Sequence, residues 1–249
     1  MKHIYLKSIK PNWKQIKPFV GINYFKFTTK LDKNNLLFSL NNSDDFKVSY
    51  NNLKIDTYNN NIPSRSRKFC HYKINIKNEN DYLVSLVDNN KFKQNAEDFR
   101  KNERVFKLMD VKFITSDWLL KFVVNLTALS FENEILKNEI SKKYCNVYVH
   151  QVRQMVTKNN ISHNSPEGIH RDGCDYIVSA YIVNKFNVQG SNSIIYDENK
   201  KKIYDTILNE NEGIYQEDKK LYHYVDEIKT MDDNYIGYRD ILGFDIQFE

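Results

Sequence analysis

The chain has 249 residues, a length that suits one large β or mixed domain and allows a sizeable hydrophobic core. Hydrophobic residues make up 41% and aromatic residues 14% of the sequence, which excludes a mainly disordered chain despite a mean hydropathy of −0.66. The net charge of +5 combines a basic first 80 residues, with 15 Lys and Arg against 5 Asp and Glu, and an acidic remainder. Because no block of five basic residues occurs, scattered surface lysines explain this asymmetry better than a nucleic-acid-binding segment does.

The three cysteines, Cys70, Cys145 and Cys174, are odd in number and widely spaced, which is typical of a reducing compartment. The first residues contain no apolar run of signal-peptide length. No segment approaches the roughly 18 consecutive apolar residues of a membrane span. The sequence therefore predicts a soluble, cytoplasmic protein.

The N-terminal part predicts short strands and turns. Apolar runs at 22–27 and 36–40 are separated by turns rich in Asn, Asp and Lys, and apolar alternation resumes at 69–76. Arg65 and Arg67 precede this alternation and would share one side of an extended chain, because side chains repeat every second residue. Two guanidinium groups so placed could clamp a carboxylate, and a solvated surface pair is the alternative.

The clearest helix is predicted over 117–139. Ser116 is placed to act as its N-cap, and Asp117 lies in the favourable first turn. Apolar residues then recur at helical spacing, namely Trp118, Leu119, Phe122, Val123, Leu126 and Leu129. This stripe predicts a helix packed on a core. A second, more polar helix is predicted around 94–109.

The pattern changes to a period of two from residue 144 onward. Candidate strands are 145–156, 174–186, 193–197, 202–208, 219–228 and 236–248. No helix-length amphipathic segment separates them, which disfavours a parallel sheet and favours an antiparallel sandwich or jelly roll. We therefore expect a single domain over 1–249, with an N-terminal elaboration up to about residue 110 and a jelly-roll core over 144–249.

A candidate metal-binding motif lies in the glycine-rich C-terminal third, where His170 and Asp172 are two residues apart. On an extended segment this spacing places both side chains on one side. The spacing alone is also compatible with a solvated loop histidine, so its surroundings must decide.

Several blocks around this motif resemble a family of small bacterial 2-oxoglutarate/Fe(II) dioxygenases of the L-isoleucine 4-hydroxylase type, whose members hydroxylate free amino acids. The blocks occur in the family's order over 147–248: His150-Gln151-Val152-Arg153, Pro166-Glu167-Gly168-Ile169-His170-Arg171-Asp172-Gly173, Asn187-Val188-Gln189-Gly190, Leu221-Tyr222-His223 and Arg239-Asp240-Ile241-Leu242. Arg65-Ser66-Arg67 also resembles an Arg-x-Arg pattern near the family's N-terminus.

The resemblance implies a mainly β, α+β fold whose core is a double-stranded β-helix (jelly-roll, cupin-like) with supporting helices on one face. It implies that His170, Asp172 and His223 form a facial triad for Fe(II), which leaves positions for 2-oxoglutarate and O2. The implied reaction couples hydroxylation of an unactivated C–H bond to decarboxylation of 2-oxoglutarate, giving succinate and CO2. No amino-acid side chain performs this oxidation, so the protein must hold the metal and orient the substrate.

The resemblance also suggests binding residues. Arg239 fits the position that holds the far carboxylate of 2-oxoglutarate, since a guanidinium fork matches a carboxylate. Gln151 and Arg153 share one strand face, and we expect one of them to reach the cosubstrate or the substrate carboxylate. Arg65 and Arg67 are further candidates for the substrate carboxylate. His150 is expected to play a supporting or structural role.

Three departures from the family pattern affect the loops that shape the pocket. Ser191 stands where a second glycine is common, and Val225-Asp226 stands near a common Thr-Pro pair. Residues 231–234 suggest a longer acidic loop. None of these positions is a proposed ligand, so they bear on which substrate is accepted.

Two other functions compete with a small-molecule oxygenase. The basic N-terminal region could direct the same chemistry to a nucleic acid or a protein, but single-strand readers interleave basic residues with exposed aromatics, and the aromatics here alternate as core positions. A non-catalytic jelly-roll binding module would be expected to have lost at least one of the three ligands or the arginine, and all four are present.

Overall fold

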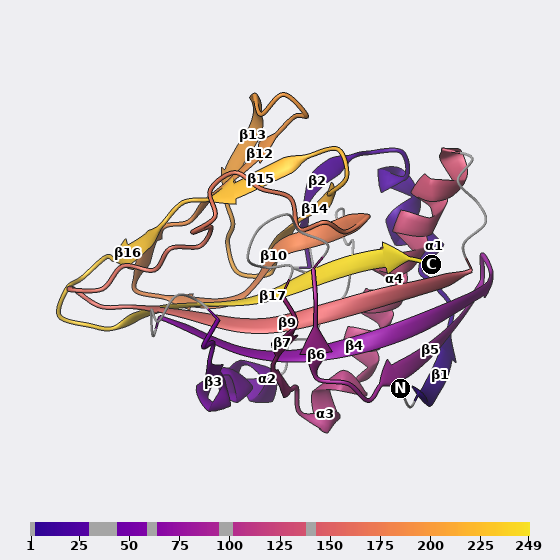
Figure 1. Cartoon of the computed structure of the whole chain (residues 1–249), viewed down its shortest axis with the longest axis horizontal. Helices are drawn as coiled ribbons and strands as arrows, with labels where there is room; N and C mark the ends of the chain where they lie inside the picture. The colour runs from indigo at the N-terminus through magenta and orange to yellow at the C-terminus, as the bar shows by residue number, and fades with distance from the viewer. Residues whose placement is uncertain (1–2, 30–43, 59–63, 95–101, 138–142) are drawn as a thin grey trace.

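The computed structural model describes residues 3–29, 44–58, 64–94, 102–137 and 143–249. A large, almost entirely antiparallel sheet runs through the whole molecule (Figure 1). Its strand order is β1 (His3–Ile9), β5 (Asp81–Val87), β4 (Arg65–Asn78), β9 (Tyr144–Val156), β17 (Gly237–Phe248), β10 (Tyr176–Phe186), β14 (Glu212–Glu217) and β2 (Tyr24–Thr28), with β3 (Lys54–Ile55) and β8 (Lys107–Leu108) on β4. The N-terminal strands thus extend the sheet that the C-terminal strands build.

Smaller sheets fold over one face of this sheet at its C-terminal half (Figure 1). They contain β13 (Lys202–Ile207), β12 (Asn192–Tyr196) and β15 (Tyr222–Val225) in one sheet and β11 (Val188–Gly190) with β16 (Ile228–Thr230) in a second. A third pair, β6 (Lys91–Phe92) with β7 (Arg104–Val105), lies beside β4, where Phe92 packs on Phe69. The large sheet and the folded-over strands form the double-stranded β-helix that was expected.

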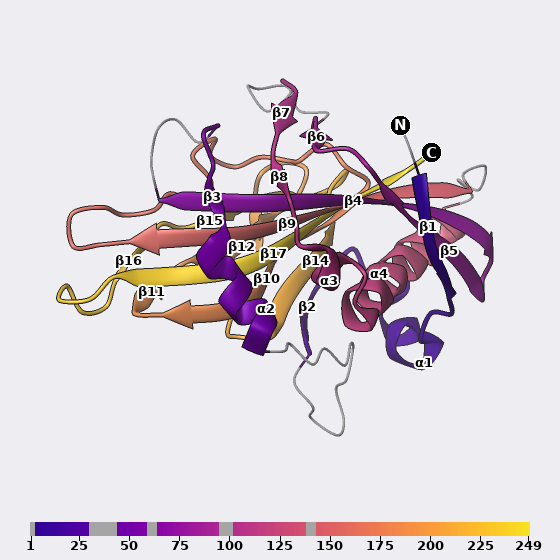
Figure 2. The same ribbon diagram turned by 90° about the horizontal axis from the view of Figure 1, so that it is seen from below.

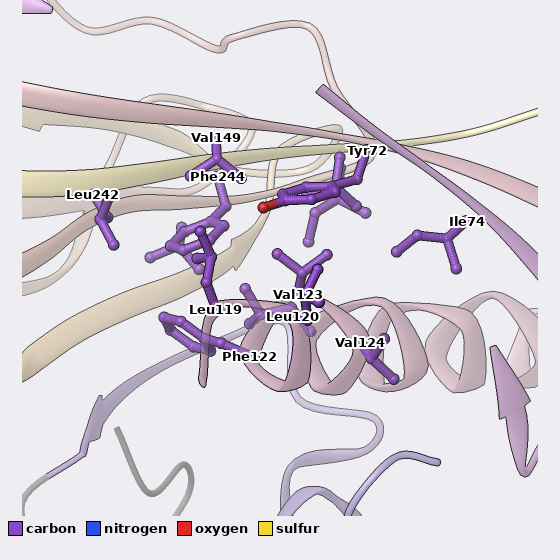
Figure 3. Packing of buried hydrophobic residues seen from close by; sticks show 14 of the residues in the cluster. Tyr72, Ile74, Leu119, Leu120, Phe122, Val123, Val124, Val149, Leu242 and Phe244 are labelled. Atoms are coloured by element: carbon purple, nitrogen blue, oxygen red, sulfur yellow. The ribbon is translucent and has the colours of Figure 1, made fainter. Parts of the chain in front are cut away.

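Helices support the opposite face of the large sheet (Figure 2). They are α2 (Asp44–Ser49), α3 (Val111–Ile114) and α4 (Asp117–Leu136), with α1 (Trp13–Ile16) and the short 3-10 turns η1 (Lys17–Phe19) and η2 (Tyr50–Asn52) nearby. The apolar stripe of α4 packs on the sheet, where Phe122 and Val123 meet Val149 and Phe244 (Figure 3). None of the helices in the described ranges is long and apolar enough to cross a membrane.

Alternation along each strand divides the large sheet into two faces. On β9, Val147 and Val149 pack under α4, whereas His150 and Val152 face the jelly-roll interior. On β17, the side chains of Leu242, Phe244 and Ile246 pack under the helix, and those of 239, 241 and 245 face the interior. Along each of these strands, alternate residues therefore belong to the hydrophobic core under the helices or to the lining of the interior cavity.

Phe122 is the part of α4 on which we expect stability to depend most. Its ring is 1% exposed and meets the rings of Phe244 and Tyr181 at centroid distances of 4.9 and 5.6 Å. Phe122→Ala should leave a cavity that the close-packed core cannot fill, lowering the free energy of unfolding by about 3–5 kcal/mol. For a chain of this size, the melting temperature should fall by roughly 10 °C in calorimetry. The matched control is Leu136→Ala at the 61% exposed end of α4, which should change stability by less than about 0.5 kcal/mol.

Several sequence-based elements are confirmed, and others need correction. The long helix and the strands at 145–156, 174–186, 193–197, 202–208 and 236–248 are present. The strand at 219–228 is instead two strands, β15 and β16, and β14 before it was missed. The apolar run at 36–40 lies outside the described residues.

The second predicted helix, over 94–109, is wrong in its described part. Residues 104–105 and 107–108 form the short strands β7 and β8, and residues 95–101 lie outside the described ranges. The reason is an aromatic cluster on the interior face, in which Phe92 and Phe106 pack with Phe69 and Tyr148. The Ser116 side chain does not cap α4 either, because its hydroxyl donates back to the carbonyl of Phe113.

Candidate active site

His170, Asp172 and His223 converge inside the jelly roll although 51 residues separate the last two along the chain. A backbone bridge sets this approach: His170 N–H donates to the His223 carbonyl at 3.1 Å, and His223 N–H donates to the His170 carbonyl at 2.9 Å. One ligand atom from each of the three side chains lies within 4.8 Å of the others. His170 Nε2 lies 3.6 Å from Asp172 Oδ1, and His223 Nε2 lies 3.7 Å from Asp172 Oδ2, so one metal ion could contact all three.

Hydrogen bonds on the far side of both rings turn the Nε2 atoms toward this centre. His170 Nδ1–H donates to the carbonyl oxygen of Gly168 at 2.8 Å, which leaves Nε2 facing the centre, where Glu167 Oε1 also lies 3.0 Å from it. Gly168 makes this possible with a φ of +79°, a conformation that disfavours other residues. The amide nitrogen of buried Gln216 lies 3.4 Å from His223 Nδ1, and with the amide turned over its oxygen, which has no partner as placed, would accept the Nδ1 proton. The donor set thus fits a divalent transition metal bound through two neutral imidazoles and one carboxylate.

The Asp172 carboxylate is held by groups that the sequence did not point to. Gln94 donates from Nε2 to Asp172 Oδ1 at 3.0 Å, and Arg104 donates to Gln94 Oε1. Asp218 accepts the backbone N–H groups of residues 172, 173 and 174, which fixes the segment that carries the ligand. Burial and the nearby Asp172 carboxylate raise the pKa of Asp218 to about 8.

The three ligands open into a cavity between the large sheet and the folded-over strands. Its lining carries an unusual number of charged and polar side chains. Besides the triad, these include Arg65, Arg67, Gln94, Arg104, His150, Gln154, Glu167, Arg239 and Asp245.

Arg239 is 2% exposed and lies in this cavity. Its Nη1 atom reaches Gln154 Oε1 at 3.5 Å, while Nη2 is buried without a hydrogen-bond partner. Within the described ranges no carboxylate forms an ion pair with it, and burial alone lowers its pKa to about 10. A buried guanidinium without a counter-charge is costly, so the site has the chemistry of a receptor for an anion.

Arg65 and Arg67 lie across the sheet from Arg239, on β4. Both approach the buried carboxylate of Asp56, with their Nε atoms 3.0 and 3.5 Å from Oδ2. Burial alone would raise the pKa of the Asp56 carboxyl group. The positive charges of Arg67 and Arg65 outweigh this effect, so the pKa lies below its usual value. Burial lowers the pKa of both arginines. Two guanidinium groups therefore share one carboxylate and leave a positive surplus at the cavity wall.

The structure corrects the expectation for Gln151 and Arg153. Both belong to the face of β9 that is turned away from the cavity, the parity of Val147 and Val149. Gln151 Nε2 donates to Ser49 Oγ at 2.7 Å. Arg153 donates from Nε and Nη2 to the two oxygens of Asp240 at 2.6 and 2.7 Å. Neither side chain lines the cavity, and the interior position on this strand belongs to Gln154 instead.

His150 faces the cavity as a supporting residue. Its Nε2 atom lies 3.3 Å from Asp245 Oδ2, and its ring packs on Phe92 at a centroid distance of 4.6 Å. Burial, with the charges of Arg67 and Arg104, lowers its pKa well below the usual value, which keeps the ring neutral.

Comparison with known proteins is consistent with this geometry. The family model for the 2OG-Fe dioxygenase matches residues 47–245. The chain belongs to the 2OG-Fe dioxygenase family. This family uses Fe(II), 2-oxoglutarate and O2, so the protein is an oxidoreductase, and the triad of His170, Asp172 and His223 offers a site for the metal.

Solved structures share the fold at low sequence identity. IDO from Bacillus thuringiensis is 19% identical with a TM-score of 0.70, and the alignment covers 95% of each chain. A bsmA homolog from Methylobium petroleophilum PM1 is 17% identical with a TM-score of 0.66, over 82% of this chain and 81% of that one. The Fe(II)/(alpha)ketoglutarate-dependent dioxygenase TqaL is 14% identical with a TM-score of 0.63, over 94% of this chain and 85% of that one. A search of curated protein sequences found no match. At these identities, the likeness to these three solved structures shows the fold alone.

Proposed function

We propose that this dioxygenase hydroxylates a free L-amino acid, or a similar small carboxylate, and converts 2-oxoglutarate to succinate and CO2 in the same turnover. The observation that carries the proposal is the buried, unpaired guanidinium of Arg239 in the cavity onto which the metal-binding triad opens. A cavity with one metal centre and two separate sets of arginines suits two small carboxylates at once.

His170, Asp172 and His223 would hold the iron, and the iron with 2-oxoglutarate supplies the oxidising power for an unactivated C–H bond. Arg239 would bind the far carboxylate of 2-oxoglutarate as a fork, with Gln154 fixing the orientation of the guanidinium through Nη1. The neutral His150 and the apolar Val152 would keep water away from the cosubstrate.

Arg65 and Arg67 would bind the carboxylate of the substrate. Strand pairing opposes Arg239 to Gln154 and Gln154 to Arg65, so the three residues form one row across β17, β9 and β4. Two strand spacings separate the backbones of Arg239 and Arg65 by about 10 Å. That separation leaves room for the two carboxylates to bind on opposite sides of the cavity, which the metal-binding triad also lines.

The test begins with the complex of iron and 2-oxoglutarate. Under anaerobic conditions, the apoprotein with Fe(II) and 2-oxoglutarate should show the weak visible charge-transfer band of such complexes. A mass-spectrometric screen of the proteinogenic L-amino acids should then find a product heavier by one oxygen atom, with succinate formed in equal amount. If an oligonucleotide or a peptide gave a product and no amino acid did, the substrate would be a nucleic acid or a protein and not a free amino acid. Absence of both band and succinate would favour a non-catalytic binding module.

A further inference from the structure

The metal ligands lie on two chain segments that run side by side from the large sheet to the folded-over strands. In the large sheet, Tyr176 at the start of β10 pairs with Glu217 at the end of β14. At the other end, His170 and His223 pair through the two backbone hydrogen bonds described above. The geometry of the metal centre therefore depends on how the two stretches between these pairs are held together.

Asp218 joins these two stretches through its side chain, which is fully buried. Its Oδ1 atom accepts the Asp172 N–H at 3.1 Å, and its Oδ2 atom accepts the N–H groups of Gly173 and Cys174 at 2.7 and 3.0 Å. Gly173 has a φ of +82°, which helps three successive N–H groups to point at one acceptor, as in backbone anion sites. This acceptor comes from the turn between β14 and β15, the strand that carries His223.

Arg171 joins the same two stretches on the side of the solvent. Its Nη2 atom donates to the carbonyl oxygen of Lys220 at 3.0 Å, and its guanidinium carbon lies 4.0 Å from the centroid of the Tyr222 ring. Contacts of this kind are weaker near solvent than in the interior. We therefore expect Asp218 to contribute more than Arg171 to the position of the ligands.

The hydrogen bonds of Asp218 use none of the proposed ligand atoms. They engage the backbone N–H of Asp172 and not its carboxylate, so they can form whether or not a metal ion is bound. A buried N–H group without an acceptor is costly, so the three hydrogen bonds restrain the whole stretch. Ligands that are already held in position lose less conformational freedom when a metal ion binds, which raises the affinity.

We propose that Asp218 is the positioning residue of the metal centre. By binding the backbone of residues 172–174 it fixes Asp172 relative to His223 in advance, and this raises the affinity of the triad for Fe(II). The inference rests on the part of the proposed function in which the triad holds the iron, and it does not depend on the substrate class.

The experiment compares wild type with Asp218→Asn, Asp218→Ala and two controls. Asp197→Asn makes the same chemical change in the turn between β12 and β13, where the carboxylate accepts the N–H groups of Asn199 and Lys201, both at 2.9 Å. Phe122→Ala lowers the stability from the opposite face of the large sheet, so it shows what destabilisation alone does to metal binding.

Three quantities are measured for each folded protein under anaerobic conditions. Calorimetric titration gives the affinity for Fe(II), and the visible band at saturating Fe(II) gives the affinity for 2-oxoglutarate. Hydrogen exchange of the peptide over 168–178, with and without Fe(II), reports directly on the three N–H groups that Asp218 accepts.

Asp218→Ala should bind Fe(II) about 10- to 100-fold more weakly than wild type, the usual effect of removing a group that orients a metal ligand. Asp218→Asn should lose less, because one oxygen remains as an acceptor. Both controls should stay within about threefold of wild type, since neither residue contacts the ligand segments. At saturating Fe(II), the affinity of both Asp218 variants for 2-oxoglutarate should also stay within about threefold, because Arg239 is unchanged.

Hydrogen exchange tests the cause of this loss. Without metal, the 168–178 peptide should exchange slowly in wild type and much faster in Asp218→Ala, and Fe(II) should slow it mainly in the variant. Exchange as fast in metal-free wild type as in Asp218→Ala would show that Asp218 does not hold this segment, and the inference would be wrong.

The outcomes separate this inference from the proposed function. If Asp218→Ala binds Fe(II) like wild type, the inference is wrong while the triad stands, and if that variant does not fold, Asp218→Asn decides in the same way. An equal loss of Fe(II) affinity in Phe122→Ala would assign the effect to stability and overturn the inference. If wild type binds no Fe(II), the proposed function fails first, and this inference fails with it.

Discussion

Asp172→Ala is expected to lower substrate-coupled succinate formation at least about 1000-fold, equivalent to roughly 4 kcal/mol of transition-state stabilisation. Asp172 is the carboxylate of the triad, and two neutral imidazoles alone bind a divalent ion weakly. The loss should appear as a missing visible band in the complex with Fe(II) and 2-oxoglutarate. The same effect is expected for His170→Ala.

The variant should nevertheless fold, because Asp172 is not part of the hydrophobic core. Its carboxylate also raises the pKa of Asp218, so its removal relieves a repulsion between two acidic groups in the ligand-free protein. The melting temperature of metal-free Asp172→Ala should therefore equal or exceed that of metal-free wild type. A variant that melts earlier but binds Fe(II) like wild type would show that Asp172 is a structural residue.

A graded control comes from the residue that orients this carboxylate. Gln94 donates to Asp172 Oδ1 and should influence the metal only through it. Gln94→Leu is expected to weaken Fe(II) binding by about 10- to 100-fold without abolishing the visible band at high iron concentration. A larger loss of Fe(II) binding in Asp172→Ala than in Gln94→Leu distinguishes the metal ligand from the residue that orients it.

The metal ligands could be proposed from the sequence because the motif is local. His170 and Asp172 are two residues apart, and family order points to His223, which the structure brings to the same centre through paired backbone hydrogen bonds. Gln94 carried no such signal. It lies on an irregular segment, and its role depends on a contact with a residue 78 positions away.

Strand parity explains why Gln151 and Arg153 were assigned to the wrong face. A shift of one position along a strand moves a side chain to the opposite face of the sheet. The odd positions of β9 before residue 151 are apolar and pack under α4, as Val147 and Val149 show. Extending that parity would have turned Gln151 and Arg153 away from the cavity and pointed to Gln154. This pattern is hard to recognise because the apolar face continues with polar residues. They lie beside α2 and η2, where Gln151 Nε2 donates to Ser49 and Arg153 Nη1 donates to Asn51.

Arg239 and Arg153 offer a matched test, since they occupy neighbouring strands on opposite faces of one sheet. Arg239→Met is expected to weaken 2-oxoglutarate binding by at least about 100-fold, the usual consequence of removing the partner of a buried carboxylate. The free energy of unfolding of the ligand-free variant should be unchanged or higher, because an unpaired, desolvated charge is replaced by an apolar side chain of similar length. Arg239→Lys keeps the charge but not the fork, so it should recover only part of the affinity.

Arg153→Met should behave in the opposite way. It leaves the fully buried carboxylate of Asp240 without its two hydrogen bonds, so the free energy of unfolding should fall by about 3 kcal/mol. Binding of 2-oxoglutarate to the folded protein should change less than about threefold, since Arg153 lies outside the cavity. Calorimetric titration with 2-oxoglutarate and chemical unfolding of both variants measure the two quantities separately. If Arg239→Met destabilised the protein and kept its affinity, Arg239 would be a structural residue, and the anion site would have to lie among the arginines of β4.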